Sequence, residues 1–144
     1  MISTKWFQGI ESKRNFIEIR KSVFCEELKV GEESISDFND QFAFNVVLYD
    51  DDKSAGTGRL IFKDGKYFID KLCVLKKFRG NNYSDLIIRM LIRKAVNIGA
   101  EKTYASIDKK YRLIFKKIGF EEIETDSNGN ILMMKEGDVG GNCS

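Results

Sequence analysis

The sequence contains no histidine and no proline, and only three of its 144 residues are cysteine. The absence of histidine excludes Ser–His and Cys–His nucleophilic sites and metal sites built on histidine. The cysteines, Cys25, Cys73 and Cys143, stand far apart without a CxxC pair, which argues against zinc and iron–sulfur sites. A sparse, odd cysteine count suits a reducing compartment. We therefore expect a cytoplasmic protein without a bound metal.

Long apolar runs are missing as well. No stretch approaches the roughly 20 apolar residues of a membrane span, and the first residues, "MISTKWFQGIESK", contain no signal-peptide core. We therefore expect no membrane association. The length and the 42% share of hydrophobic residues suit one domain with a real core. We predict a domain over residues 1–136 and a flexible C-terminal tail over 137–144.

Charge is distributed unevenly along the chain, although the net charge is only +2. Residues 1–55 hold 7 basic and 11 acidic groups, whereas residues 71–117 hold 13 basic and 3 acidic groups. The second region suits a polyanion and the first could suit a cation. Nucleic-acid binding through the basic region is disfavoured, because no array of exposed aromatics and no nucleic-acid motif accompanies the charge.

Hydrophobic periodicity indicates one α+β domain. Apolar residues alternate in several segments, and elsewhere they recur at helical spacing. Two dipeptides, Asp64-Gly65 and Asn128-Gly129, are typical of tight hairpins, and Gly99 is a plausible helix stop. The patterns predict strands at 4–8, 41–50, 55–62, 67–75 and 102–107, a hairpin within 120–135, helices over 11–28 and 84–98, a short helix before Gly119, and room for another in 29–41.

The loop that precedes the second long helix combines several anion-binding features. Arg79 can contact phosphate oxygens in bidentate fashion, and Gly80 lets the backbone approach a ligand closely. Asn82 tolerates the left-handed conformation, and Ser84 can cap the helix through its side chain. A helix start also presents unpaired N–H groups. These features fit a cradle for a diphosphate and, equally, an ordinary capped loop.

The order of elements helps to decide between these interpretations. A strand, an Asp-Gly hairpin, a strand, a basic loop, a helix, a strand and a short helix ending in "FKKIGF" resemble the GNAT acyltransferase superfamily over roughly residues 14–120. In that family the loop reads Arg/Gln-x-x-Gly-x-Gly/Ala and binds the pyrophosphate of acetyl-CoA. Arg79 matches the first position, while Asn82 and Ser84 replace the two small residues. The segment "IRKSVFCEE" at 19–27 resembles a bacterial branch of the family.

The resemblance implies a GNAT-like fold with a mixed, mostly antiparallel twisted sheet of about six or seven strands, about four flanking helices and a splayed central strand pair. It also implies a cofactor site. The backbone of Leu72–Val74 would pair with the pantetheine arm and polarise the thioester carbonyl. Cys73 itself fits a packed small hydrophobe better than an acyl nucleophile. The implied cofactor-binding residues are Leu72, Cys73, Val74, Arg79, Gly80, Asn81, Asn82, Tyr83, Ser84 and Phe115.

The family often uses a tyrosine before its "Glu-Lys-Leu-Gly-Phe" segment to protonate the departing thiolate, and here Phe115 takes that place. Loss of a general acid costs about 10²–10⁴ in rate. A thiol with a pKa near ~8.5 leaves tolerably without help, so the replacement is compatible with a slower enzyme. Tyr111, one helical turn earlier, is a candidate substitute, and Tyr83 is a second candidate. Each also fits a partly buried aromatic side chain without a catalytic role, the interpretation that the sequence favours for Tyr111.

The acceptor amine needs a base or an anchor, and the acidic N-terminal region offers both. Glu27, followed by Glu26, is the candidate, because these residues end the first predicted helix, where the family assembles its acceptor wall. Glu32, Glu33, Asp37 and Asp40 follow in the sequence and are compatible with an acidic wall or with a solvated loop.

The sequence therefore favours an N-acetyltransferase that moves an acetyl group from acetyl-CoA to a primary amine by direct attack in a ternary complex. The alternative is a catalytically weak or silent CoA- or acyl-CoA-binding protein of the same fold. The acceptor would be a small-molecule or peptide amine, and a homodimer is compatible with the sequence.

Overall fold

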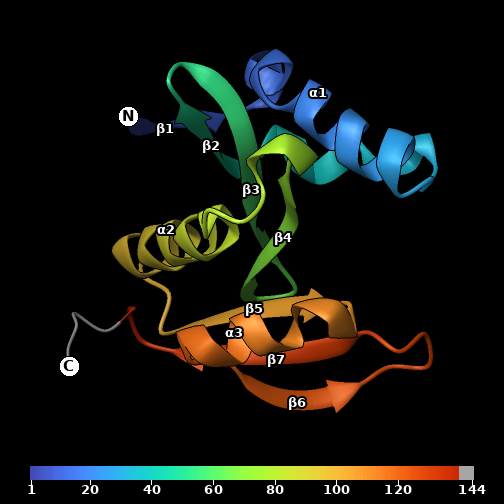
Figure 1. The fold of residues 1–144 in the computed structure, drawn as a ribbon. Coiled ribbons are helices and arrows are strands. Elements are labelled where there is room, and N and C mark those ends of the chain that lie inside the picture. The colour runs from blue at the N-terminus through green and yellow to red at the C-terminus, as the bar shows by residue number, and fades with distance from the viewer. Residues whose placement is uncertain (140–144) are drawn as a thin grey trace.

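A computed structural model describes residues 1–139 of the chain (Figure 1). Its strands are β1 (Ile2–Gln8), β2 (Phe44–Asp50), β3 (Lys53–Lys63), β4 (Lys66–Val74), β5 (Lys102–Ile107), β6 (Glu121–Thr125) and β7 (Ile131–Glu136). Its α-helices are α1 (Ile17–Arg20), α2 (Tyr83–Asn97) and α3 (Arg112–Ile118). Segments of 3-10 or π-helix are η1 (Ile10–Asn15), η2 (Lys21–Glu27), η3 (Glu32–Ser34), η4 (Phe38–Gln41), η5 (Lys76–Phe78) and η6 (Lys109–Tyr111).

The described strands form one sheet in the order β1-β2-β3-β4-β5-β7-β6. Strands β4 and β5 run parallel, and the other neighbouring pairs in the described chain are antiparallel. The parallel pair joins the β1–β4 half of the sheet to the β5–β7 half, which Figure 1 shows as the upper and lower parts of the molecule. The mixed, mostly antiparallel sheet of the predicted α+β domain is confirmed.

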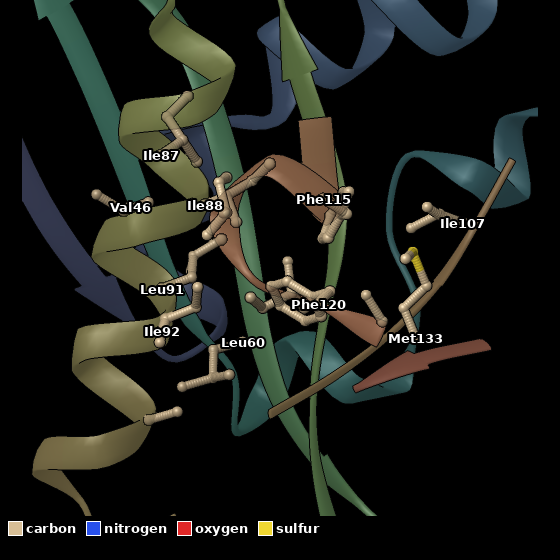
Figure 2. Close-up of a cluster of buried hydrophobic side chains, with 14 of the residues drawn as sticks. Val46, Leu60, Ile87, Ile88, Leu91, Ile92, Ile107, Phe115, Phe120 and Met133 are labelled. Atoms are coloured by element: carbon tan, nitrogen blue, oxygen red, sulfur yellow. The ribbon is translucent and has the colours of Figure 1, made fainter. Parts of the chain in front are cut away.

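Helices cover both faces of this sheet. On one face, α2 packs its apolar side against β2 and β3 through Ile87, Ile88, Leu91 and Ile92, and α3 adds Phe115 to the same core (Figure 2). On the other face, Phe16 before α1, Ile19 of α1 and Val23 of η2 cluster with Val47 and Cys73. The sheet is thus buried on both sides near its centre.

The first predicted helix, over 11–28, is interrupted in the structure. The 3-10 helix η1 ends at Asn15. Phe16, with φ −132°, separates it from α1, and α1 continues into the π-helix η2. Phe16 is fully buried, so this change of backbone direction serves the packing of its ring. A π-helix widens the helical turn and is frequent at functional sites. The apolar spacing predicted the buried face correctly but not the changes of helix type.

The predicted turns are present. Asp64 and Gly65 both adopt positive φ, 53° and 78°, as a tight hairpin between β3 and β4 requires. Gly99 follows α2 at φ 110°. Gly129 has φ 85°, and the Asp126 side chain accepts from the backbone N–H groups of Asn128 and Asn130, which closes the hairpin between β6 and β7.

The packed domain extends beyond the boundary expected at residue 136. Gly137 donates its N–H to the Glu101 carbonyl at 2.9 Å, and the Val139 side chain is buried in the core beside α2. Residues 140–144 of the predicted tail lie outside the described residues.

Candidate functional site

The central strands β4 and β5 diverge. They pair through Tyr67–Thr103, Phe68–Tyr104 and Ile69–Ala105, and the pairing ends there although β4 continues to Val74 and β5 to Ile107. A β-bulge causes the divergence: the register of β4 against β3 shifts between Asp70 and Cys73, and Lys71 adopts φ 50°. Backbone groups of β4 beyond Ile69 therefore face β5 without a strand partner.

The divergence opens a cavity of about 540 Å³. Residues from both faces of the sheet line it: Phe24, Leu28, Val30, Ser34, Ile69, Asp70, Lys71, Leu72, Ser106, Ile107, Asp108, Lys110, Tyr111 and Phe115. A second cavity of about 310 Å³ adjoins it through Leu28, Leu72, Lys110 and Tyr111. Cys73, Val74, Arg79, Ser84 and Glu27 also line this second cavity. Strand β4, the loop before α2 and helix η2 therefore meet at one place.

The loop before α2 presents free backbone donors. Gly80 has φ 91° and Asn82, the N-cap residue, has φ 62°, so the left-handed conformation predicted for Asn82 is confirmed. The backbone N–H groups of Gly80, Asn81 and Asn82 donate to no described residue. The first N–H groups of a helix also lack partners within the helix. The loop thus has the donors that an anion requires.

The prediction that Ser84 caps α2 is wrong. Helix α2 begins at Tyr83, and no side chain makes a capping hydrogen bond at its N-terminus. Ser84 lies inside the first turn and lines the second cavity instead. The Asn81 side chain donates to the Phe78 carbonyl at 2.9 Å and holds the loop rather than pointing to a ligand.

Arg79 and Glu27, predicted in separate roles, bind each other. The Arg79 guanidinium donates two hydrogen bonds of 2.6 Å to the Glu27 carboxylate, and its Nε donates to the Val74 carbonyl at 3.0 Å. These hydrogen bonds hold the pKa of Glu27 below its usual value, which makes the carboxylate a weaker base. The ion pair joins the loop before α2 to η2 at the mouth of the second cavity.

Of the predicted acidic residues, Glu26, Glu32 and Glu33 line neither cavity, whereas Asp37 and Asp40 join an arginine network that reaches Asp70 in the larger cavity. Glu26 is exposed and lines neither cavity; it borders a separate depression beside Leu75 and Lys76. Asp37 and Asp40 are engaged by arginines, as described below. Glu32 and Glu33 lie in the exposed segment η3.

The candidate tyrosines occupy different places. Tyr111 lines both cavities, and its hydroxyl makes no hydrogen bond to a described residue. The Tyr83 hydroxyl donates to Asp50 at 2.5 Å, which raises the pKa of Tyr83 to about 12 and occupies its proton. Phe115 is buried edge-on against Phe120, with ring centroids 4.9 Å apart, and borders the larger cavity. The geometry favours Tyr111 over Tyr83 as a proton donor.

Cys73 is unsuited to nucleophilic chemistry. Its side chain is buried against Phe16 and Ile19, and burial raises the pKa of the thiol to about 12. A thiol in that state is not ionised near neutral pH. Its side chain belongs to the core, as the sequence indicated.

Sequence reasoning missed a buried ionic network that ends in the larger cavity. Arg59 donates to Asp70 through Nε and Nη2, both at 2.7 Å, and to Asp37 through Nη1 at 2.6 Å. Arg20 donates to both oxygens of Asp40, at 3.1 and 3.2 Å. The signal in the sequence was the charged pair Asp70-Lys71 within the otherwise apolar strand "YFIDKLCV".

Two further observations concern residues 1–139, one on metal-ligand side chains and one on the helices. Histidine, cysteine, aspartate and glutamate side chains of this part nowhere gather in a group of three that could hold a metal ion. None of its helices is both long and apolar enough to cross a membrane.

The fold and the site define a class: a single α+β domain whose central sheet splits over a cavity, with a loop of unpaired backbone N–H groups beside the split. The model of the acetyltransferase (GNAT) domain matches residues 14–134, and the chain belongs to this family. The sequence is 28% identical over 110 residues to the uncharacterized N-acetyltransferase YjcF of Bacillus subtilis strain 168, covering 76% of this chain and 79% of that protein.

Solved structures show the same fold. An acyl-CoA N-acyltransferase from Pseudomonas aeruginosa superposes with a TM-score of 0.82 at 15% identity, covering 94% of this chain and 99% of that one. An aminoglycoside 6'-N-acetyltransferase complexed with coenzyme A superposes with a TM-score of 0.72 at 16% identity, covering 94% and 96%. The recognised family and the predicted fold are thereby confirmed.

Proposed function

We propose that this chain transfers an acetyl group from acetyl-CoA to a primary amine, by direct attack of the amine within a ternary complex. The observation that carries the proposal is the end of β4–β5 pairing at Ile69 and Ala105, which leaves strand backbone facing a cavity of about 540 Å³. The likeness to a structure complexed with coenzyme A supports a CoA site. The acceptor is a small-molecule or peptide amine, and the cytoplasm is the expected compartment.

The residues present fit acetyl-CoA. The free N–H groups of Gly80–Asn82 and of the first turn of α2 would receive the diphosphate. The backbone of Leu72–Val74 would receive the pantetheine arm in place of the missing strand partner. Arg79 reaches a phosphate by exchanging its Glu27 carboxylate for phosphate oxygens, which are acceptors of the same bidentate kind.

This exchange also prepares Glu27 for proton transfer. Without Arg79 the pKa of Glu27 returns toward its usual value, and the carboxylate becomes free to take a proton from the acceptor ammonium. The neutral amine nitrogen then attacks the thioester carbon, and a backbone N–H of β4 stabilises the developing oxyanion. The C–S bond breaks, the second amine proton passes to solvent water, and the thiolate takes up a proton from the Tyr111 hydroxyl, which solvent restores.

The experiment measures thiol release from acetyl-CoA across a panel of primary amines, together with calorimetry of acetyl-CoA and CoA. We expect binding of both nucleotides and amine-dependent thiol release. If neither nucleotide binds, the proposal is wrong. CoA binding without thiol release across a broad panel of amines would favour a silent CoA-binding protein. The buried Phe115, at the position of the family's tyrosine, supports this alternative function.

A further inference from the structure

We propose that the larger cavity selects an acceptor amine that also carries a carboxylate, and that the ammonium group of Lys71 binds this carboxylate. The inference rests on the proposed acetyltransfer and names its substrate class.

Lys71 occupies a special place in the fold. It stands in the β4 bulge at φ 50°, a conformation that side-chain-bearing residues adopt rarely, and it lines the larger cavity. The bulge re-aims the side chain relative to a regular strand. Its Nζ lies 5.8 Å from the centroid of the Phe24 ring, which lines the same cavity. The next residue, Leu72, belongs to the backbone segment that we assign to the thioester.

Within residues 1–139, no carboxylate is bonded directly to the ammonium group of Lys71. It forms neither an ion pair nor a hydrogen bond with a described residue. The cavity's own carboxylates are already engaged, because Arg59 donates two hydrogen bonds to Asp70 and the backbone N–H of Lys110 donates to Asp108. Among the described residues, Lys71 is therefore a cation of the cavity without a directly bound counter-charge, and Asp70 and Asp37 act on it only at longer range.

This cation is also poorly solvated. Burial, with a further contribution from Arg59, lowers the pKa of Lys71. A carboxylate bound beside it would offset both effects, since it supplies the opposite charge and a strong hydrogen-bond acceptor. A second ammonium group on the substrate would meet repulsion there. The cavity thus favours an acid-bearing amine over a diamine.

The rest of the cavity suits an apolar body. Its remaining lining is dominated by the side chains of Leu28, Val30, Ile69, Ile107 and Phe115. Because Lys71 and Leu72 are adjacent along β4, the carboxylate would lie close to the reacting amine. An amino acid with an apolar side chain has this combination of groups.

The experiment compares two pairs of amines that differ by a carboxylate: L-leucine with isopentylamine, and L-phenylalanine with 2-phenylethylamine. The readout is the ratio of kcat/KM within each pair, from thiol release. We expect the wild-type protein to prefer the acids, and Lys71→Met to lower that preference about tenfold, the loss of one charge-assisted hydrogen bond. Lys71→Arg keeps the charge and should keep the preference. Lys63→Met, at an exposed lysine outside both cavities, is the matched control.

A second readout needs no turnover. Calorimetry of L-leucine against the CoA-saturated protein should show binding that isopentylamine does not share and that Lys71→Met weakens. The inference is overturned if the wild-type protein uses the carboxylate-free amines equally well, or if Lys71→Met leaves both the ratio and the leucine affinity unchanged. Absence of thiol release with every amine contradicts the proposed function instead, and the calorimetric comparison still decides the role of Lys71.

Discussion

Arg79 is the residue at which the sequence and the structure differ most instructively. Its position in the loop predicts a phosphate ligand, but in the structure its side chain pairs with Glu27. No periodicity reveals such a contact, because the two residues lie 52 positions apart in the chain. The position of Lys71 in the cavity could not be predicted for a similar reason, since a strand pattern does not show where a bulge changes the direction of a side chain.

A pair of substitutions tests the exchange of partners by Arg79. Arg79→Ala should weaken CoA binding by about 1–3 kcal/mol, the usual range for a lost charged hydrogen bond. Glu27→Gln should bind CoA at least as tightly as the wild type, because Arg79 is released, yet turn over about 10²-fold more slowly for lack of a base. Calorimetry and thiol release measure the two effects. Arg14→Ala, at an exposed arginine outside both cavities, is the control. An unchanged affinity of Arg79→Ala for CoA would contradict the assignment of Arg79 to the CoA site.

Tyr111 gives a second prediction at this scale. Tyr111→Phe should lower kcat about 10²-fold, the low end of the range for a general acid, because a thiolate departs with little help. Its affinity for CoA should change little. Tyr104→Phe is a matched control, since Tyr104 lies half-buried on β5 and packs against Phe68 away from the site. Equal kcat in the two variants would exclude Tyr111 as the acid.

At the scale of elements, periodicity and turn chemistry predicted strands and helix α2 well because those signals are local. The Asp64-Gly65 hairpin and the stop at Gly99 depend on backbone conformations that few residues adopt. The division of the first helix into 3-10, α and π segments could not be predicted, since it follows from the burial of Phe16 against a sheet distant in sequence. The divergence of β4 and β5 was predicted from the resemblance to the family, because the pattern of the strands does not indicate it.

The contact between α2 and β3 depends on Gly58. A Cβ atom there would lie 2.7 Å from Ile87 Cγ2 and 2.7 Å from Leu91 Cδ1, both fully buried. Gly58→Ala should therefore destabilise the protein by about 1–3 kcal/mol through overpacking. Urea unfolding measures the change. In the control Gly31→Ala, the added methyl group meets the flexible Glu33 side chain, which can move away. Equal stability of the two variants would show that α2 sits further from β3 than described.

At the scale of the whole molecule, the ionic network links the N-terminal segments to the sheet. Arg20 and Arg59 are almost fully buried, and they bind Asp40 from α1 and β3. Hydrogen bonds from Arg59 hold the pKa of Asp37 below its usual value. Burial alone would raise the pKa of Asp40, but hydrogen bonds and charge from Arg20 outweigh it and lower that pKa as well.

These pKa shifts predict how stability depends on pH. The two carboxylates contribute stability above their unfolded pKa near ~3.9, and the contribution is lost as the pH falls through their lower folded values. Asp40→Asn should cost about 3–5 kcal/mol near neutral pH, because it leaves buried arginine charge unpaired, and it should flatten the acid limb of the stability curve. Urea unfolding from pH 7 to pH 3 tests this, with Asp64→Asn in the exposed hairpin as the control. An acid limb as steep as that of the wild type would contradict the assignment.

Backbone hydrogen exchange with and without CoA tests the central claim most directly, because the claim concerns unpaired N–H groups. We predict slower exchange on CoA binding in two segments, residues 72–74 of β4 and residues 79–84 of the loop and first turn of α2, with little change in the edge strands β1 and β6. Tight CoA binding that leaves exchange in both segments unchanged would contradict the account.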